Sequence, residues 1–209
     1  MISQIKVGGH DRNFSYLVGD PDSNSVSIVD PANLLFLREK IQQKNLAPKM
    51  ILLTHSHFDH TEAAVEMAKL YNIPVYIHKN ARGRVAGLDP FAHFITDGDE
   101  LRMGKTKIRV MHTPGHCDDA VCFYVKPYLL TGDTVFVGKC GRTDLEGGSV
   151  EDLYNSIQII KNLPDNTIIY PGHDYGLIPN TTVEFEKAQN ELFRCGSLEE
   201  FIQLKSSKS

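Results

Sequence analysis

The apolar residues in the first part of the chain are spaced as short strands followed by a helix. Three β-branched or alternating runs, separated by glycine- and proline-containing breaks, are predicted to be strands: Ile2 to Val7, Phe14 to Val18 and Val26 to Val29. A helical spacing then begins after Asn33, with apolar residues at Leu34, Leu37 and Ile41. This order of elements predicts a sheet with a helix packed on it.

Compact apolar runs and helical periods alternate along the rest of the chain. Further strands are predicted at Met50 to Leu53, Val75 to Ile77, Lys107 to Met111, Val121 to Val125, Tyr128 to Leu130 and Ile168 to Tyr170. Further helices are predicted at Thr61 to Tyr71, Val150 to Asn162, Thr181 to Leu192 and Leu198 to Leu204. Antiparallel pairing suits the consecutive strands between Val121 and Leu130, so the pattern indicates a layered α/β structure with mixed sheets. No repeat or linker divides the sequence, and we expect residues 1–209 to form one domain.

Composition and charge argue against several classes of function. The sequence is 41% hydrophobic and 23% charged, which is typical of a globular protein. A net charge of −4 without any basic stretch argues against a nucleic-acid partner. The apolar runs are too short to cross a bilayer, and the first residues do not resemble a signal peptide, so we expect a cytoplasmic protein with no membrane partner. The four cysteines form no C-x-x-C pair, and we expect them to be reduced.

A cluster of histidines follows the apolar run from Met50 to Leu53. The chain there reads Thr54-His55-Ser56-His57-Phe58-Asp59-His60. A loop leaving a strand end can turn all of these polar side chains inward, and imidazole nitrogens with a carboxylate suit Zn²⁺, Fe²⁺ or Mn²⁺ in an open site. One such histidine alone would be read as a structural or surface residue, but their close spacing predicts a metal site.

Three later segments repeat this arrangement of a polar residue just after an apolar strand. They are His112-Thr113-Pro114-Gly115-His116, Thr131-Gly132-Asp133-Thr134 and Tyr170-Pro171-Gly172-His173-Asp174. A glycine in each lets the backbone turn tightly next to the candidate ligand. Each segment alone is a weak signal. Together with the first motif they supply enough candidate ligands for two metal ions: His55, His57, Asp59, His60, His116, Asp133 and His173.

The order T-H-x-H-x-D-H, T-P-G-H, G-D and P-G-H, from about Ile2 to His173, resembles the metallo-β-lactamase superfamily. The resemblance implies an αββα sandwich of two mixed sheets flanked by helices, with two divalent metal ions at one edge; zinc is expected first, with iron or manganese as alternatives. By position it implies His55, His57 and His116 for the first ion, Asp59, His60 and His173 for the second, and Asp133 as the bridge. Such ions lower the pKa of a bound water, so that a hydroxide able to attack a carbonyl is available near neutral pH. Asp59 is also a candidate to orient that hydroxide or to carry its proton.

The stretch from Gly132 to Asp144 narrows the resemblance to two branches that act on glutathione derivatives. Glyoxalase II enzymes carry a similar G-D-T-L-F followed by C-G and a basic residue, whereas glutathione persulfide dioxygenases carry C-G-R-T-D, found here at residues 140–144. The resemblance makes Arg142 and Tyr175 candidates to contact the glutathione part, with Lys139 as a third. The alternatives are a solvated or ion-paired Arg142 and an ordinary packing role for Tyr175.

The leading prediction is a metal-dependent hydrolase that cleaves a glutathione-type thioester such as S-lactoylglutathione. One alternative is a glutathione persulfide dioxygenase that uses a single iron, held by the residues matching His55, His116 and Asp133. Another is a non-catalytic metal-binding member. The dioxygenases have A-D-H where this chain has Phe58-Asp59-His60, which favours the hydrolase, while the C-G-R-T-D stretch favours the dioxygenase.

The chain after the last predicted ligand is short. Residues 174–209 leave room for two helices and a tail, whereas full-length glyoxalase II adds a helical region that supplies part of the glutathione pocket. The pocket is therefore expected to be incomplete, or the substrate to be a different thioester, and a homodimer could cover the edge left open.

Several other polar residues are expected to have ordinary roles. His10, His78 and His93 lie outside the motifs and are expected at the surface or the edge of the core. His112 is expected to support the site rather than to bind metal. Cys117 is expected to be a small buried residue, with a place beside the site as the alternative.

Overall fold

The computed structural model describes residues 2–8 and 11–207 of the chain. Its strands are β1 (Ile2–Lys6), β2 (Phe14–Gly19), β3 (Ser25–Val29), β4 (Ala47–Leu52), β5 (Val75–His78), β6 (Ala92–Ile95), β7 (Glu100–Met103), β8 (Thr106–His112), β9 (Val121–Val125), β10 (Tyr128–Gly132), β11 (Val135–Phe136), β12 (Lys139–Cys140), β13 (Ile168–Pro171) and β14 (Thr181–Thr182). Its helices are α1 (Leu34–Gln43), α2 (Phe58–Thr61), α3 (Ala64–Tyr71), α4 (Val150–Lys161), α5 (Val183–Gln189), α6 (Glu191–Arg194) and α7 (Leu198–Ser206), with a 3-10 turn at Lys79–Ala81.

Two six-stranded sheets contain both parallel and antiparallel neighbours. The first has the order β1-β2-β3-β4-β5-β6, antiparallel as far as β3 and parallel from β3 onward. The second has the order β14-β13-β10-β9-β8-β7, in which β10 and β13 are the parallel pair. The antiparallel pairing of β9 with β10 confirms the pairing expected between Val121 and Leu130. The short strands β11 and β12 form a separate hairpin.

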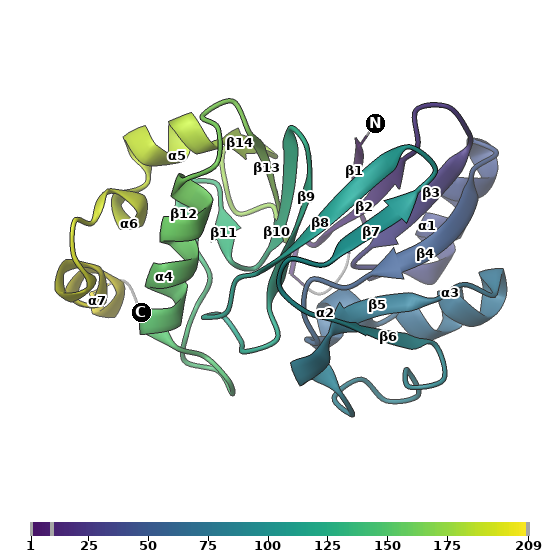
Figure 1. Ribbon diagram of the computed structural model, residues 1–209, viewed down its shortest axis with the longest axis horizontal. Helices are drawn as coiled ribbons and strands as arrows, with labels where there is room; N and C mark the ends of the chain where they lie inside the picture. Colours follow the sequence, from purple (N-terminus) through teal and green to yellow (C-terminus); the bar gives the residue numbers. More distant parts are fainter. Residues whose placement is uncertain (1, 9–10, 208–209) are drawn as a thin grey trace.

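The helices lie on the outer sides of the two sheets (Figure 1), and three layers of buried side chains hold sheets and helices together. The middle layer joins the two sheets and includes Phe14 from β2 and Phe123 from β9. On the outer face of the first sheet, α1 and α3 bury residues such as Leu37 and Met67. On the outer face of the second sheet, α4 to α7 bury residues such as Leu153. This helix–sheet–sheet–helix order confirms the predicted αββα sandwich of two mixed sheets.

The first helix forms as its sequence pattern predicts. Asn33 caps α1 by accepting a hydrogen bond from the backbone nitrogen of Phe36 at 3.0 Å. The apolar positions Leu37 and Ile41 are its buried residues and face the first sheet. The polar residues between them face solvent, so the helical period confirms the predicted face.

Two predicted helices are wrong in extent. The helix expected from Thr61 to Tyr71 begins only at Ala64, and the end of the histidine motif, expected to be a loop, forms the short helix α2. The helix expected from Thr181 to Leu192 is divided into β14, α5 and α6. The break occurs because Asn190 has an extended backbone and its side chain caps α6 by accepting from the backbone nitrogen of Leu192 at 3.1 Å. Strands β6 and β7 were not predicted, because each is short and largely half-buried or exposed.

The segment after residue 173 contains more structure than was expected. In place of two helices, it forms β14, α5, α6 and α7 in the described part of the chain. These helices pack beside α4 at the outer face of the second sheet (Figure 1). Within residues 2–8 and 11–207, the structure has no helix with the length and apolar character needed to span a membrane.

Candidate metal centre

The side chains predicted to bind metal come together at the ends of four strands. They are His55, His57, Asp59 and His60 after β4, His116 after β8, Asp133 after β10 and His173 after β13. Strand β4 belongs to the first sheet, and the other three strands belong to the second. The site therefore forms only when the two sheets are packed together.

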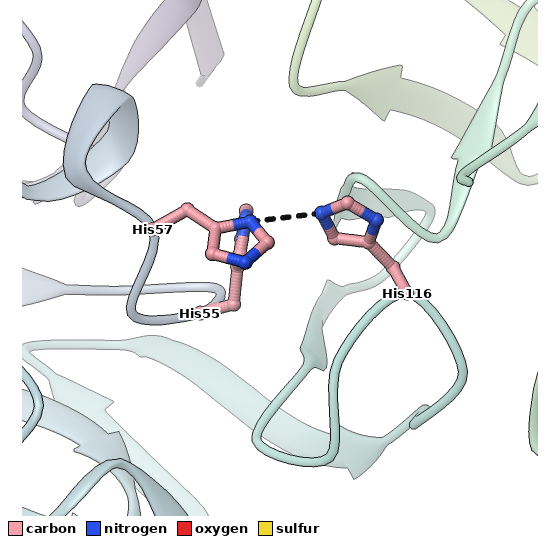
Figure 2. A group of neighbouring side chains, drawn as sticks. All are labelled: His55, His57 and His116. Atoms are coloured by element: carbon pink, nitrogen blue, oxygen red, sulfur yellow. Dashed lines mark hydrogen bonds between the residues drawn. The ribbon is translucent and has the colours of Figure 1, made fainter. Parts of the chain in front are cut away.

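Three histidines form the first group of inward-facing side chains (Figure 2). The Nδ1 atom of His57 lies 3.0 Å from Nε2 of His55 and 3.0 Å from Nε2 of His116. The ring planes of His57 and His116 are nearly perpendicular, at 89°. A ring nitrogen has one hydrogen or one lone pair to offer, so three nitrogens facing one point suit a shared cation better than mutual hydrogen bonds.

A second group contains Asp59, His60 and His173. The Nε2 atom of His60 lies 3.2 Å from Nε2 of His173 and 3.5 Å from Oδ2 of Asp59. Asp133 lies between the two groups, because its Oδ1 is 3.3 Å from Nε2 of His60 and its Oδ2 is 3.6 Å from Nε2 of His116. A carboxylate that faces both groups has the position of a bridging ligand.

The outward nitrogens of four of these histidines are fixed by oxygen atoms. Two of the partners are side chains: Nδ1 of His55 contacts the Thr54 hydroxyl at 3.1 Å, and Nδ1 of His60 contacts the Asp30 carboxylate at 3.0 Å. The other two are backbone carbonyls: Nδ1 of His116 contacts that of Arg142 at 2.9 Å, and Nδ1 of His173 contacts that of Asp11 at 2.7 Å. Such contacts fix the ring orientation and leave Nε2 with its lone pair directed inward. The rings are thus held ready to bind a cation.

Asp30 is a residue of the candidate site that the sequence analysis did not predict. It is buried, and its Oδ1 accepts a hydrogen bond from the backbone nitrogen of Thr54 at 2.8 Å. Its Oδ2 accepts from the Thr54 hydroxyl at 2.7 Å and also faces His60. Asp30 directly follows the apolar run from Val26 to Val29, so the strand-end pattern that marked the other residues could have found it.

Asn13 was missed as well, and no pattern in the sequence marks it. Its side-chain nitrogen donates to Oδ2 of Asp59 at 2.9 Å and to the carbonyl of Asp59 at 3.2 Å. Asn13 also pairs with His173 through an isolated β-bridge. This buried amide therefore orients the one carboxylate of the second group.

Burial and neighbouring charges determine which groups carry protons. Burial, followed by the charge on His60, holds the pKa of His55 well below its ordinary value, so this ring is neutral. Burial alone would also lower the pKa of His60, but the carboxylates of Asp133 and Asp30 raise it well above the usual range. Burial would raise the pKa of Asp133, but His60 and His173 hold it well below. His60 and Asp133 thus form an ion pair in which a metal cation would replace the proton.

Two further observations fit a bound metal. The Oδ1 atom of Asp133 is buried and has no hydrogen-bond partner besides its 3.3 Å ion-pair contact with Nε2 of His60, so it has room to bind a cation. A Cβ atom at Gly172 would lie 2.3 Å from that same Oδ1, so only glycine lets this turn come so close. Imidazole and carboxylate donors in this number are the ligands that zinc, iron and manganese use in open sites.

The C-terminal helices support the loop that holds His116. Buried Glu186 of α5 accepts from the backbone nitrogen of Gly138 at 3.1 Å, and Asn190 donates to Glu186 at 2.7 Å. Lys205 of α7 donates to the carbonyl of Gly141 at 2.7 Å. The next carbonyl in the chain, that of residue 142, contacts Nδ1 of His116. The segment after residue 173 is therefore connected to the site through this loop.

The residues predicted to contact glutathione lie at the rim. Arg142 is exposed, and its guanidinium makes paired hydrogen bonds of 2.7 Å to Asp144, which is the ion-paired alternative considered for it. Tyr175 stacks flat on His173, with ring centroids 4.8 Å apart, and its hydroxyl donates to Asp11. Lys139 is an exposed residue of β12. Tyr175 thus lies against the site, while the two basic side chains stay in solvent, and their role in recognition stays a prediction.

The remaining polar residues have ordinary places. His112 contacts the carbonyl of Asp118 at 2.9 Å and stacks on buried His78, with ring centroids 4.0 Å apart. His93 is exposed, and His10 lies outside the described residues. Cys117 is buried, and burial raises the pKa of its thiol. All four cysteines are free thiols, as expected.

Comparisons with known proteins agree with the αββα fold. Residues 8–173, which include every predicted ligand, match the family model described as the metallo-beta-lactamase superfamily. The probable polyketide biosynthesis zinc-dependent hydrolase BaeB from Bacillus velezensis is 32% identical over 206 residues, covering 94% of this chain and 88% of that protein. A hydroxyacylglutathione hydrolase from Wigglesworthia glossinidia brevipalpis is 34% identical over 173 residues, covering 83% of this chain but only 66% of that protein. The crystal structure of ETHE1 from Myxococcus xanthus superposes with a TM-score of 0.87 at 29% identity, covering 100% of this chain and 91% of the other.

Proposed function

The chain belongs to the metallo-β-lactamase superfamily, and from this premise we propose that it is a metal-dependent hydrolase of a glutathione-type thioester. Its cofactor would be two divalent metal ions, with zinc before iron or manganese. The residues that would hold them are His55, His57 and His116 for the first ion, Asp59, His60 and His173 for the second, and Asp133 for both.

The complete set of inward-facing donors carries this proposal. Both groups of donors are present, their atoms lie within 4.8 Å of one another in each group, and Asp133 faces both. A member that had lost its chemistry would have no need to keep so many buried polar groups together, because each costs free energy when it has no partner. This argues against a member that has lost its metal ions together with its chemistry.

Hydrolysis of a thioester requires one nucleophile and a good leaving group. When bound, divalent ions would act as Lewis acids and would lower the pKa of water, so that a hydroxide nucleophile is available near neutral pH. The carboxylate of Asp59 is partly exposed and is held in place by Asn13, so it can orient that water and accept its proton. The water oxygen then bonds to the carbonyl carbon and the C–S bond breaks, which gives a carboxylic acid and a thiolate, and the proton taken up by Asp59 is available to convert the thiolate to the thiol. A thiolate with an ordinary pKa of about 8.5 leaves without prior protonation, so no further acid is needed.

A glutathione-type substrate is supported by the hydroxyacylglutathione hydrolase among the relatives. The chain spans about two thirds of that relative, so the whole activity of the longer protein is carried over here only as a proposal. Tyr175, stacked on His173, is the best placed of the predicted contacts, and Arg142 would have to exchange Asp144 for a substrate carboxylate. Free, buried thiols agree with the reducing cytoplasm predicted for the protein.

The second candidate is a glutathione persulfide dioxygenase with one iron. The stretch Cys140-Gly141-Arg142-Thr143-Asp144 favours it, and the iron would be held by His55, His116 and Asp133. This alternative leaves His57, which faces both His55 and His116 at 3.0 Å, without a metal to bind. A complete set of donors permits two metal ions, and Phe58-Asp59-His60 in place of the dioxygenases' A-D-H favours the hydrolase, which we therefore prefer.

One preparation of the protein can separate the two candidates. Elemental analysis would count and identify the metals. The same sample would then be assayed for cleavage of S-lactoylglutathione and for oxygen uptake with glutathione persulfide. Two zinc-like ions with thioester cleavage support the hydrolase. One iron with oxygen uptake that depends on persulfide, and no thioester cleavage, would overturn it.

A further inference from the structure

A large cavity opens beside the first group of histidines. Its volume is about 870 Å³, and His57 lies in its wall. Cys117, which directly follows His116, lines the same wall. The cavity therefore adjoins the candidate metal centre at the first group of histidines, whereas Tyr175 stacks on His173 of the second group. None of the residues predicted to recognise glutathione lines it.

Two segments from different parts of the chain form the sides of this cavity. One side is the stretch through α2 and α3, including Phe58 and Val65. The other is the loop after β5, including Val85 and Ala86. A Cβ atom on Gly87 of this loop would lie 3.8 Å from a methyl group of Val65, so the two sides approach each other closely there.

Arg84 fixes the loop that forms the second side. Its guanidinium makes paired contacts to Asp118, one of them 3.0 Å long, and a 3.2 Å contact to buried Asp119. Both aspartates follow His116 closely in the chain. The loop is therefore anchored to the same segment that carries a predicted ligand, and the cavity is preformed.

The lining shows which part of a thioester the cavity suits. Phe58, Val65 and Val85 give it an apolar surface, and the Phe58 ring is 63% exposed. The charged side chains of the lining are Glu62, Glu66 and Glu146 against Lys69 and Arg84, and the charge of Arg84 is already balanced by Asp118. The carboxylates of glutathione would meet net negative charge here, whereas an uncharged acyl chain would cover exposed apolar surface.

We propose that this cavity binds the acyl part of the substrate, and that the substrate carries an uncharged acyl chain longer than lactoyl. The inference rests on the proposed thioester hydrolase. It assigns opposite ends of the site to the two parts of the substrate: the thiol part lies toward Tyr175, and the acyl chain lies between α3 and the loop at residues 84–87.

Binding of thioethers, which cannot be hydrolysed, tests this assignment on the metal-loaded protein. Calorimetry would compare S-hexylglutathione with S-methylglutathione, and we expect the hexyl compound to bind about tenfold or more tightly because it buries additional methylene groups. Ala86→Trp fills the cavity from the exposed loop, and Val65→Trp fills it from α3. Leu70→Trp is the matched control, because Leu70 is on α3 and 49% exposed but lines a different cavity.

Both cavity variants should lose the preference for the hexyl compound, and the control should keep it. Equal binding of the two thioethers, no measurable binding of either, or a preference kept in both cavity variants would overturn the assignment. Turnover of hexanoyl- and lactoylglutathione separates this result from the proposed function. If lactoylglutathione is cleaved but the hexyl preference is absent, the cavity assignment is wrong and the proposed function remains supported. If no thioester is cleaved but the preference depends on Ala86 and Val65, the proposed reaction is wrong, and only the binding of an uncharged chain in this cavity is supported.

Discussion

The interior of the candidate metal centre and its rim are built in different ways. In the interior, His60 is fully buried, contacts Asp30 on one ring nitrogen and faces Asp133 and His173 with the other. At the rim, Arg142 is exposed and pairs with the equally exposed Asp144. Interior side chains are thus fixed before any substrate arrives, whereas rim side chains can change partners at small cost. Substitutions in the interior should therefore have the larger effects.

The largest effect is expected at Asp133, because it faces both groups of donors. Asp133→Ala should empty the site and reduce thioester turnover by more than the roughly 100-fold seen when supporting residues are lost. Elemental analysis and a turnover assay would check this. Asp22→Ala is the control, since Asp22 pairs with Lys105 at the surface. A variant at Asp133 that keeps its metal and its activity would show that the bridging assignment is wrong.

A smaller effect is expected at Asp30, which contacts His60 and Thr54 but lies behind the inward-facing atoms. Asp30→Asn keeps the shape of the side chain and removes its charge. We expect metal affinity to fall about 10- to 100-fold, as is usual for residues that orient a metal ligand. Competition with a chromophoric chelator would measure it, and Asp22→Asn is the control. An affinity equal to that of the unchanged protein would mean that Asp30 supports the fold alone.

Next in size is the support that the C-terminal helices give to His116. Lys205→Met removes the hydrogen bond to the carbonyl of Gly141 and keeps the length of the side chain. One such bond contributes about 1 kcal/mol, so metal affinity should fall about fivefold. Lys187→Met is the matched control, because Lys187 is a residue of α5 that pairs with Asp165 rather than with the loop. If the two variants behave alike, the loop does not depend on α7.

The smallest effect is expected at the rim. Arg142→Ala should raise KM for glutathione thioesters by no more than about fivefold, because ionic contacts of an exposed side chain are screened by solvent and contribute little. KM for small thioesters without glutathione should stay the same. Steady-state kinetics with both substrates would show the difference. An equal change in both would remove the proposed role of Arg142 in recognition.

The same contrast explains how much could be predicted from the sequence. The inward-facing residues could be found because each directly follows an apolar strand, a pattern that lies within a few neighbouring positions. Asp30 has this pattern too and was overlooked. Asn13 could not be found in this way, because its contact with Asp59 joins residues 46 positions apart and nothing local marks it.

The C-terminal segment shows the second limit. Its length predicted two helices, but the side chains of Thr182 and Asn190 each cap a helix start, which divides one expected helix into separate elements. Its contribution to the site was not predicted, because the contact between Lys205 and Gly141 spans 64 positions. The ion pair that keeps Arg142 at the rim also depends on how the loop folds, and the motif alone does not contain that information.

Reconstitution of the metal-free protein tests the central claim most directly. The metal would be removed with a chelator, zinc would be added back in known amounts, and cleavage of a glutathione thioester would be followed at each step. We predict that turnover is lost on chelation, rises as zinc is added until two equivalents are bound per chain, and then stays constant. Turnover that survives chelation, or that returns completely with one equivalent, would contradict the two-metal hydrolase.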